Sequence, residues 1–327
     1  MYTIVIDIYG ADAGTAPILK GTAKALQLGL PFFPVFVGNQ QTVRQAMDEA
    51  GIGENAYRVL HTEQFISPEA PPTCIFGGMD DSSMAMAYGY LKQEPECQAM
   101  LSAGNTGALL VGSICRLGLL PGLKFPALAS ALPCAGEKLV CLVDCGANMD
   151  CTAADLARFA QMGNVFSKSC CSIEAPRVGL MSVGREARKG TALIQEAHQL
   201  ISQLPLNFVG NLEGSDLVSG YADVIVTDGF SGNLLLKNTE AVGKAAVEVV
   251  RQLGAEADPQ LIAKLEEALF ARFDFNAQGA ATFLGPKKTV VKMHGCANED
   301  TTVASIRQIL RLEKAGFCQA MKNALQK

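Results

Sequence analysis

Short apolar runs and amphipathic stretches alternate along most of the chain. The apolar runs predict buried strands at 3–8, 31–37, 57–61, 98–101, 125–132, 138–143, 178–183, 207–210, 224–227 and 289–293. Residue spacing and composition predict helices at 18–28, 41–50, 82–92, from 108 onward, at 153–168, 191–203, 234–253 and 259–272, and from 302 to the end. This alternation predicts an α/β protein with a mostly parallel sheet that helices cover on both faces.

The length and the apolar content bear on the domain organisation. The chain has 327 residues, of which 49% are hydrophobic and 18% are charged, so it can bury a large core. We interpret residues 1–327 as a single α/β domain. The helices expected at 234–253 and 259–272 follow one another closely, and we expect them to form a helical hairpin at about 234–275.

Two similar glycine turns join a predicted strand to a predicted helix. The first is Ser102-Ala-Gly-Asn-Thr-Gly107, and the second is Asp228-Gly-Phe-Ser-Gly-Asn233. In each turn, glycine lets a ligand approach the main chain, and hydroxyl and amide side chains stand beside the first N–H groups of the helix. A helix start of this kind favours phosphate. Two matched turns therefore indicate a shared polar ligand site.

In a parallel sheet the ligand lies at the carboxyl ends of the strands, where polar residues gather in this sequence. These residues are Asp7, Gly10 and Asp12; Ser102, Gly104, Asn105, Thr106 and Gly107; Asp144, Gly146 and Asn148; Glu186, Lys189 and Gly190; Asp228, Ser231, Gly232 and Asn233; and Lys292, His294 and Gly295. We predict that they converge on one pocket. Glycine-rich loops with a few cations suit a phosphate-bearing substrate or product. The set has no dinucleotide fingerprint, no Walker lysine loop and no nucleophile elbow.

Charge and composition exclude other classes of function. The formal net charge is −5 and tryptophan is absent, which argues against a nucleic-acid binder. No segment has the roughly 18 consecutive apolar residues of a membrane span. The N-terminal residues read as a strand without a basic leader, so we expect a cytoplasmic protein.

The eleven cysteines predict free thiols rather than a metal site. None forms a Cys-x-x-Cys pair, and the three histidines do not cluster with them, so we expect no metal. So many free thiols fit a reducing cytoplasm. Cys145, Cys151 and Cys296 lie near the strand-end motifs, but we identify no adjacent histidine base and do not expect a nucleophile among them.

Several motifs in one order give the chain a resemblance to a known family. They are Asp80-Asp-Ser-Ser-Met84, Ser102-Ala-Gly-Asn-Thr-Gly-Ala-Leu-Leu110, Val143-Asp-Cys-Gly-Ala-Asn-Met-Asp150, Pro176-Arg-Val-Gly-Leu180, Glu186 with Lys189-Gly190, Asn207-Phe-Val-Gly-Asn-Leu-Glu-Gly-Ser-Asp216, Asp228-Gly-Phe-Ser-Gly-Asn233 and Val291-Lys-Met-His-Gly295. Over nearly its whole length the chain resembles the PlsX-type phosphate acyltransferases.

The resemblance implies a fold, a reaction and partners. The fold is a three-layer α/β/α arrangement related to phosphotransacetylase and the isocitrate dehydrogenase class, usually a homodimer, without metal; we expect no cofactor. The reaction is acyl transfer from an acyl carrier protein thioester to inorganic phosphate, which supplies acyl phosphate for phospholipid synthesis. Acyl carrier protein and phosphate are therefore the expected partners.

For this reaction we expect phosphate, held by the turn N–H groups and by Lys189 or Lys292, to attack the thioester carbonyl. Asn105, Asn148 or Asn233 would stabilise the oxyanion. His294 would donate a proton or orient phosphate, or it is an ordinary hydrogen-bonded histidine at a strand end. Asp144 and Asp228 would hold loops or touch substrate. The predicted catalytic residues are Lys292, His294, Asn105 and Lys189, and the other strand-end residues would bind substrate.

The chain departs from the family pattern in three places. The first loop keeps Asp7, Gly10 and Asp12 but lacks the usual second glycine, asparagine and proline. Asp80 stands where basic residues are usual, which would weaken the attraction of phosphate or an acidic carrier. The late Gly-Gly-Ala-Pro run reads Gly279-Ala-Ala-Thr282. These departures suggest altered substrate use or reduced activity.

The expected hairpin resembles a family region that forms dimers and can touch lipid. Its acidic residues, Glu240, Glu248, Glu256, Asp258, Glu266, Glu267 and Asp274, outnumber Lys244, Arg251, Lys264 and Arg272. Anionic lipid favours basic helices, so we expect a dimer contact with weak or peripheral membrane association at most.

Other functions remain open. One is a phosphotransacetylase-like enzyme that forms acyl or acetyl phosphate from coenzyme A or another thioester. Another is a homologue that binds without turnover, which Asp80 and the altered first loop favour. An NAD-dependent dehydrogenase is disfavoured, because the dinucleotide fingerprint and an acidic metal cluster are missing.

Overall fold

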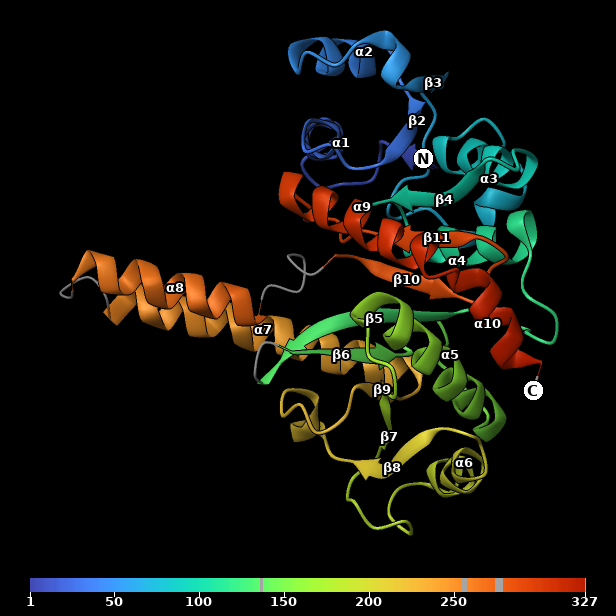
Figure 1. The fold of residues 1–327 in the computed structure, drawn as a ribbon, viewed down its shortest axis with the longest axis vertical. Helices are drawn as coiled ribbons and strands as arrows, with labels where there is room; N and C mark the ends of the chain where they lie inside the picture. Colours follow the sequence, from blue (N-terminus) through green and yellow to red (C-terminus); the bar gives the residue numbers. More distant parts are fainter. Residues whose placement is uncertain (136–137, 254–257, 274–278, 327) are drawn as a thin grey trace. The chain divides into compact units, whose positions relative to one another are not determined.

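The computed structural model describes residues 1–135, 138–253, 258–273 and 279–326 (Figure 1). The chain divides into two compact units, and each is described by itself. Unit 1 comprises Met1–Leu128 and Gly279–Lys327, and unit 2 comprises Ala129–Gln278. The single-domain interpretation stays a prediction.

Unit 1 is built on six strands in the order β3-β2-β1-β4-β11-β10. They are β1 (Tyr2–Asp7), β2 (Phe32–Gly38), β3 (Arg58–His61), β4 (Cys97–Ser102), β10 (Ala281–Leu284) and β11 (Thr289–Lys292). Neighbours from β3 to β11 run parallel, and β10 runs antiparallel to β11. The parallel register brings the carboxyl ends of β1, β4 and β11 to one edge.

Helices cover both faces of the unit 1 sheet. They are α1 (Ala16–Gln27), α2 (Gln40–Glu49), α3 (Ser83–Gln93), α4 (Thr106–Gly112), α9 (Glu299–Lys314) and α10 (Phe317–Leu325). Ile4 and Ile6 of β1 share a core cluster with Ile18 of α1 and Ile306 of α9. Val5, which is also fully buried, belongs to the opposite face, which α3 covers. This alternation along a buried strand is what a sheet with two covered faces requires.

Unit 2 carries five strands in the order β5-β6-β9-β7-β8. They are β5 (Ala127–Cys134), β6 (Lys138–Val143), β7 (Arg177–Met181), β8 (Asn207–Leu212) and β9 (Val224–Val226). The predicted strand pair β5 and β6 is antiparallel, and the remaining neighbours are parallel. Helices α5 (Ala153–Cys171) and α6 (Ala192–Ser202) pack against each other over these strands.

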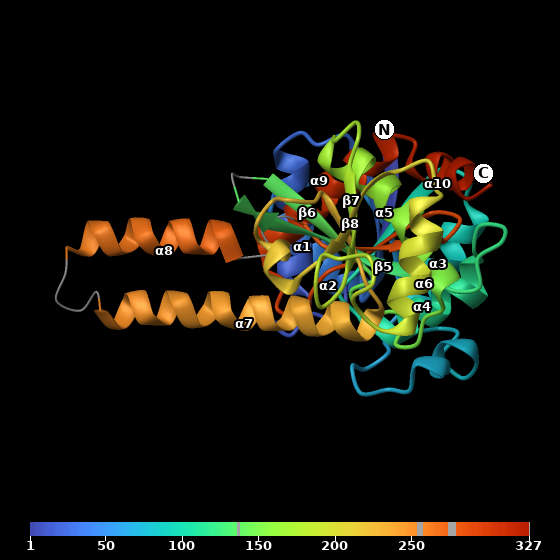
Figure 2. The same ribbon diagram turned by 90° about the horizontal axis from the view of Figure 1, so that it is seen from below.

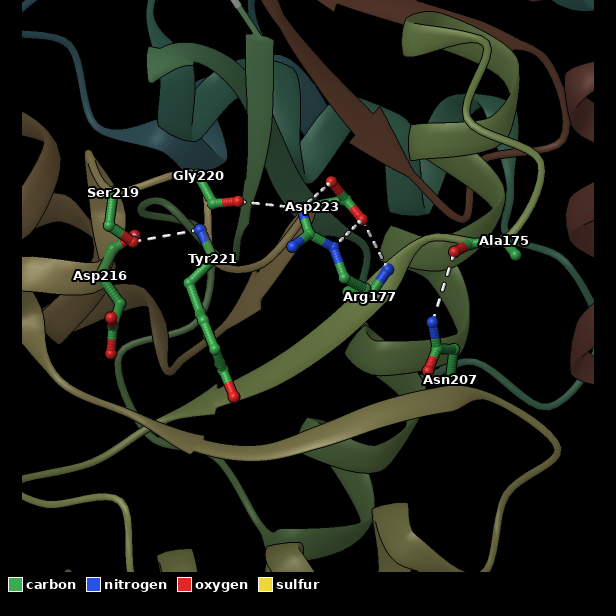
Figure 3. A network of polar contacts seen from close by, with 8 residues as sticks. All are labelled: Ala175, Arg177, Asn207, Asp216, Ser219, Gly220, Tyr221 and Asp223. Atoms are coloured by element: carbon green, nitrogen blue, oxygen red, sulfur yellow. Dashed lines mark hydrogen bonds and ion pairs between the residues drawn. The ribbon is translucent and has the colours of Figure 1, made fainter. Parts of the chain in front are cut away.

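The amino end of β7 is fixed by a polar network (Figure 3). The Arg177 guanidinium donates from Nε and Nη2 to the two carboxylate oxygens of Asp223, over 2.9 and 2.8 Å. The Arg177 backbone N–H donates to the same carboxylate, and Nη2 also donates to the Gly220 carbonyl. The network ties β7 to the segment that enters β9. It lies at the end of β7 remote from the predicted site residues 186–190.

The predicted helical pair is present as α7 (Gly229–Leu253) and α8 (Pro259–Phe273). The two helices pack against each other and extend beyond the strands of unit 2 (Figure 2). An ion pair of 3.0 Å joins Arg251 Nε to Glu266 Oε1. Part of the charge comparison made from the sequence lies outside the described residues: Glu256, Asp274 and the side chain of Arg272. A dimer contact through this pair stays a prediction.

Several elements differ from the sequence prediction. Strand β10 was not predicted from the sequence. Helix α7 begins at Gly229, so the second glycine turn forms its first turn. The expected last helix divides at Gly316, whose φ of 64° ends α9 and starts α10.

Among the described helices, none has both the length and the apolarity to cross a membrane.

Candidate functional site

Three strand-end loops of unit 1 come together. Ser102 Oγ donates to Asp7 Oδ2 over 2.8 Å, which joins the ends of β4 and β1. The Asp12 N–H donates to the Gly295 carbonyl over 2.7 Å, which joins the first loop to the loop after β11. The Met293 N–H donates to the Ser102 carbonyl, and Lys292 is in register with Ser102. We call these loops the unit 1 cluster: Asp7, Gly10, Asp12, Ser102, Gly104, Asn105, Thr106, Gly107, Lys292, His294 and Gly295.

Asp7 is a buried carboxyl at the centre of the unit 1 cluster. Its exposed fraction is 2%. Burial raises its pKa from 3.8 to about 6, against the lowering effects of the Ser83 and Ser102 hydroxyls and the Tyr9 N–H. Burial disfavours the charged form of a carboxyl, and each hydrogen bond to that form favours it. Asp7 thus joins the loop ends and titrates about two pH units above an ordinary aspartate.

Gly10 lets the first loop touch the glycine turn after β4. Its φ is 96°, and a Cβ atom placed there would lie 2.4 Å from the Cα of Gly104. Any other residue would therefore separate the two main chains. The close contact therefore requires glycine at position 10.

Tyr9 anchors the altered first loop and was missed by the sequence analysis. Its ring stacks on Phe65 at a centroid distance of 5.1 Å. Its hydroxyl donates to the Thr62 carbonyl and accepts from the Asn39 N–H. Burial raises the pKa of this hydroxyl, so it remains protonated and able to donate. An aromatic residue in a loop gives no periodic pattern, and only its partners reveal the role.

The structure gives Asn105 a loop-holding role. Its Oδ1 caps α4 by accepting from the Ala108 N–H over 3.0 Å. Its Nδ2 lies within hydrogen-bond distance of the carbonyls of Ser67, Pro68 and Ala70. These contacts engage both ends of the amide, so the geometry favours a structural role over the expected oxyanion contact.

Asp80 is neutralised by a neighbouring cation. Its carboxylate accepts a charge-assisted hydrogen bond from Arg116, which also donates twice to the Ile75 carbonyl. Arg116 follows α4 in a short π-helical turn. The pairing reduces the repulsion of anions that the sequence suggested for Asp80.

In the loop after β11, His294 lies against Cys296. His294 Nδ1 is 3.0 Å from Cys296 Sγ and accepts from the Cys296 N–H over 3.2 Å. Both residues are exposed, and Lys292 is half-buried. The expectation that Cys296 has no adjacent histidine was therefore wrong, although the His-Gly-Cys spacing was readable in the sequence. Burial raises the pKa of Cys145 strongly and that of Cys151 to about 12, which disfavours the thiolate that a nucleophile requires.

In unit 2 the loop after β6 wraps around a buried carboxylate. Asp144 accepts the N–H groups of Gly146, Ala147 and Asn148 over 3.0, 2.9 and 2.7 Å. The Asn148 side chain also donates to Asp144, over 2.6 Å. This is the loop-holding role considered for Asp144. It leaves the Asn148 amide engaged within its own loop.

The start of α7 packs against the same loop. The Gly229 N–H donates to the Asn148 carbonyl over 2.7 Å. A Cβ atom at Gly232 would lie 1.9 Å from the Asp144 carbonyl oxygen, so only glycine fits there. Asp228 accepts from both the N–H and the hydroxyl of Ser231. We call Asp144, Gly146, Asn148, Asp228, Ser231, Gly232 and Asn233 the unit 2 cluster.

Asn233 is placed differently from the other two predicted amides. It is exposed, and its side chain lies against Gly146, where a Cβ atom would be 3.6 Å from Asn233 Oδ1. Because Asn105 and Asn148 hold loops, Asn233 is the amide best placed to meet a ligand.

Glu186, Lys189 and Gly190 form a separate loop after β7, on the other side of β9. The Lys189 N–H donates to the Glu186 carbonyl, and Asn211 of β8 donates to the same carbonyl over 2.9 Å. The side chains of Glu186 and Lys189 are exposed. Asn211 and His198 were not predicted as site residues; Asn211 Oδ1 and His198 Nδ1 are 2.9 Å apart. The expectation that all these loops share one pocket stays a prediction.

Comparisons with known proteins agree with the resemblance. The family model described as "Fatty acid synthesis protein" matches residues 2–320. A phosphate acyltransferase of Thermoanaerobacterium thermosaccharolyticum is 36% identical over 313 residues, which cover 93% of this chain and 91% of that protein. One from Clostridioides difficile is 31% identical over 332 residues, which cover 99% and 96%.

Solved structures show the same fold at low identity. A phosphotransacetylase from Streptococcus pyogenes aligns with a TM-score of 0.63 at 15% identity, covering 100% of this chain and 95% of its own. A branched-chain phosphotransacylase from Enterococcus faecalis aligns with a TM-score of 0.62 at 16% identity, and the alignment covers 95% of this chain and 98% of that protein. The predicted α/β fold class is thus confirmed. Because the family model spans nearly the whole chain and its relatives are 36% and 31% identical, the chain belongs to the phosphate acyltransferase family.

Proposed function

We propose that this chain is a phosphate acyltransferase that moves an acyl group from an acyl carrier protein thioester to inorganic phosphate. The product is an acyl phosphate for phospholipid synthesis. The observation that carries the proposal is the 36% identity to a phosphate acyltransferase across 93% of the chain. The clustered strand-end loops supply main-chain N–H groups and lysines of the kind that bind phosphate.

Within the reaction, we assign phosphate binding to the N–H groups of the glycine turns with Lys189 or Lys292. Phosphate attacks the thioester carbonyl, and negative charge develops on the carbonyl oxygen. Asn233, exposed beside Gly146, is the proposed amide donor to that oxygen. The leaving thiol has a pKa of about 8.5, so it departs with little help from an acid.

The test is release of carrier thiol from an acyl carrier protein thioester, with and without phosphate. We expect release that depends on phosphate and continues over many turnovers, and Asn233→Ala slows it by more than about tenfold. Asn207→Ala is the matched control, because Asn207 is an exposed amide at the amino end of β8. Faster release from a coenzyme A thioester would favour the phosphotransacetylase-like alternative, and no release from either donor would favour the binding homologue.

We propose that α7 and α8 form a homodimer contact. Apolar side chains project from them into solvent, with exposed fractions of 54% for Val242, 53% for Val249 and 52% for Leu261. Such a surface gains stability when a second copy covers it. Light scattering after size exclusion should give twice the chain mass, and Val249→Lys should give the single mass. A monomeric unmodified protein would contradict the contact.

Membrane association of this helix pair is proposed to be weak at most. Two of its basic side chains are paired internally, Lys237 with Glu240 and Arg251 with Glu266. Internal pairing reduces the attraction to anionic headgroups. Strong co-sedimentation with anionic vesicles at physiological salt would contradict this view.

The proposed compartment is the cytoplasm. All eleven cysteines lie in the described residues and are free thiols. So many thiols fit a reducing environment. Thiol titration of protein taken directly from lysed cells should find eleven reactive groups after unfolding.

A further inference from the structure

Cys296 and His294 form a thiol–imidazole pair, and the thiol has no role in the proposed reaction. All eleven cysteines are described, and among them Cys115 and Cys296 are exposed. Cys296 Sγ lies 3.0 Å from His294 Nδ1. A nucleophile within hydrogen-bond distance of a base is the arrangement of enzymes that form covalent acyl intermediates.

The backbone hydrogen bond to His294 Nδ1 indicates which tautomer the imidazole adopts. The Cys296 N–H points to His294 Nδ1 over 3.2 Å. A backbone N–H only donates, so Nδ1 carries a lone pair and the neutral ring holds its proton on Nε2. The thiol is then the second donor to Nδ1, and Nδ1 is ready to take the thiol proton. The thiolate that results is the nucleophilic form of cysteine.

The pair stands among residues assigned to the substrates. Lys292, a proposed phosphate ligand, is the last residue of β11, and the Cys296 loop follows it directly. The Gly295 carbonyl accepts from the Asp12 N–H over 2.7 Å, so this loop is bound to the unit 1 cluster. A thioester donor brought to the cluster therefore meets an exposed thiol with its own base.

From this geometry we propose that the Cys296 thiol accepts an acyl group covalently. The proposal rests on the proposed function, which supplies the thioester donor. The Cys296 thiolate attacks the thioester carbonyl, and a new carbon–sulfur bond forms. The bond between the acyl carbon and the carrier sulfur breaks, and the carrier thiolate receives the proton that His294 Nδ1 held. One thioester replaces another, so the step needs no oxidant, reductant or further reactant.

The experiment incubates purified protein with an acyl carrier protein thioester in the absence of phosphate. We expect a burst of about one carrier thiol per chain and an equal mass gain of one acyl group on the peptide that contains Cys296. Neutral hydroxylamine should remove the group, as it does from thioesters. Cys296→Ala should abolish the adduct, whereas Cys115→Ala, at the other exposed thiol, should leave it unchanged.

His294→Asn separates the base from the structural contact. The asparagine oxygen can still accept the Cys296 N–H but takes no proton, so we expect acylation to slow by more than about tenfold while thermal unfolding stays unchanged. Absence of the adduct, equal labelling of Cys115, or an unchanged rate in His294→Asn would overturn the proposal. Phosphate-dependent turnover, followed in the same assay, reports separately on the proposed function.

Discussion

Ser102 Oγ donates a hydrogen bond of 2.8 Å to Asp7 Oδ2, between a fully buried hydroxyl and a carboxyl that is 2% exposed. The two residues are separated by 95 positions in the chain and end two neighbouring strands. The bond therefore holds together the two loops on which the rest of the unit 1 cluster is arranged.

The buried state of Asp7 makes stability depend on pH. Its folded pKa of about 6 lies above the ordinary value of 3.8, so the stability that the protonated form contributes is complete at low pH and is lost as pH rises through about 6. Asp7→Asn removes this loss. Between about pH 4.5 and about pH 7.5, the free energy of unfolding measured in urea should fall by about 2 kcal/mol more for the unmodified protein than for the variant. Asp48→Asn, at an exposed carboxyl on α2, should show no such difference.

Asn105→Asp isolates one half of the Asn105 contacts. The carboxylate still caps α4 at Ala108, but it faces the carbonyls of Ser67 and Ala70 without a donor. We expect hydrogen exchange at 67–70 to accelerate by more than about tenfold, and α4 to keep its protection. Asn105→Ala should in addition lose about 1 kcal/mol of capping energy. Slow exchange at 67–70 in the aspartate variant would show that the amide does not hold this loop.

Lys292→Ala tests the phosphate role of the β11 end. Removal of a cation from an anion site should cut acyl phosphate formation by more than about tenfold, and Lys292→Arg should restore part of the rate. Lys322→Ala, at an exposed side chain of α10, serves as the control. If the Lys292→Ala rate equals that of the control, Lys292 does not act on phosphate.

Gly232→Ala tests the contact between α7 and the β6 loop. The added Cβ would lie 1.9 Å from the Asp144 carbonyl oxygen, so the main chains must separate. We expect a loss of about 2 to 3 kcal/mol in the free energy of unfolding, measured in urea. Gly89→Ala is matched to it, because a Cβ at Gly89 of α3 meets nothing within 4 Å and should stabilise the helix by about 1 kcal/mol.

Arg177→Lys tests the polar network at the amino end of β7. Burial alone would raise the pKa of Asp223, but the hydrogen bonds and charge of Arg177 lower it overall. The stability from this pair is therefore complete above pH 3.8 and is lost as pH falls through the lowered pKa. Lysine keeps the charge but lacks the planar fork that bonds both carboxylate oxygens of Asp223. The free energy of unfolding near neutral pH should therefore fall by about 1 kcal/mol. The difference should shrink in strong acid; a constant difference would contradict the assignment.

The sequence determined the elements and their order, because strands buried on both faces leave continuous apolar runs and helices leave a periodic stripe. It also placed the polar residues at strand ends, where loops must carry them. Asp144 and Asp228 were correctly considered as loop-holding groups, since a carboxylate followed by glycine or asparagine finds N–H partners within four residues. Local chemistry of this kind is written in the sequence.

Contacts between distant residues were decided only by the tertiary structure. The motif around Asn105 predicted that its amide contacts a ligand. Instead, its Nδ2 lies within hydrogen-bond distance of carbonyls 35 to 38 positions away in the chain. Asp7 meets Ser102 because strand order places β1 beside β4. Asp80 meets Arg116 because α3 packs against the turn that follows α4. The loop after β11 bends so that His294 lies beside Cys296. A spacing of two residues permits this contact but does not require it. Side-chain partners depend on chain paths in three dimensions, and a one-dimensional pattern constrains those paths without fixing them.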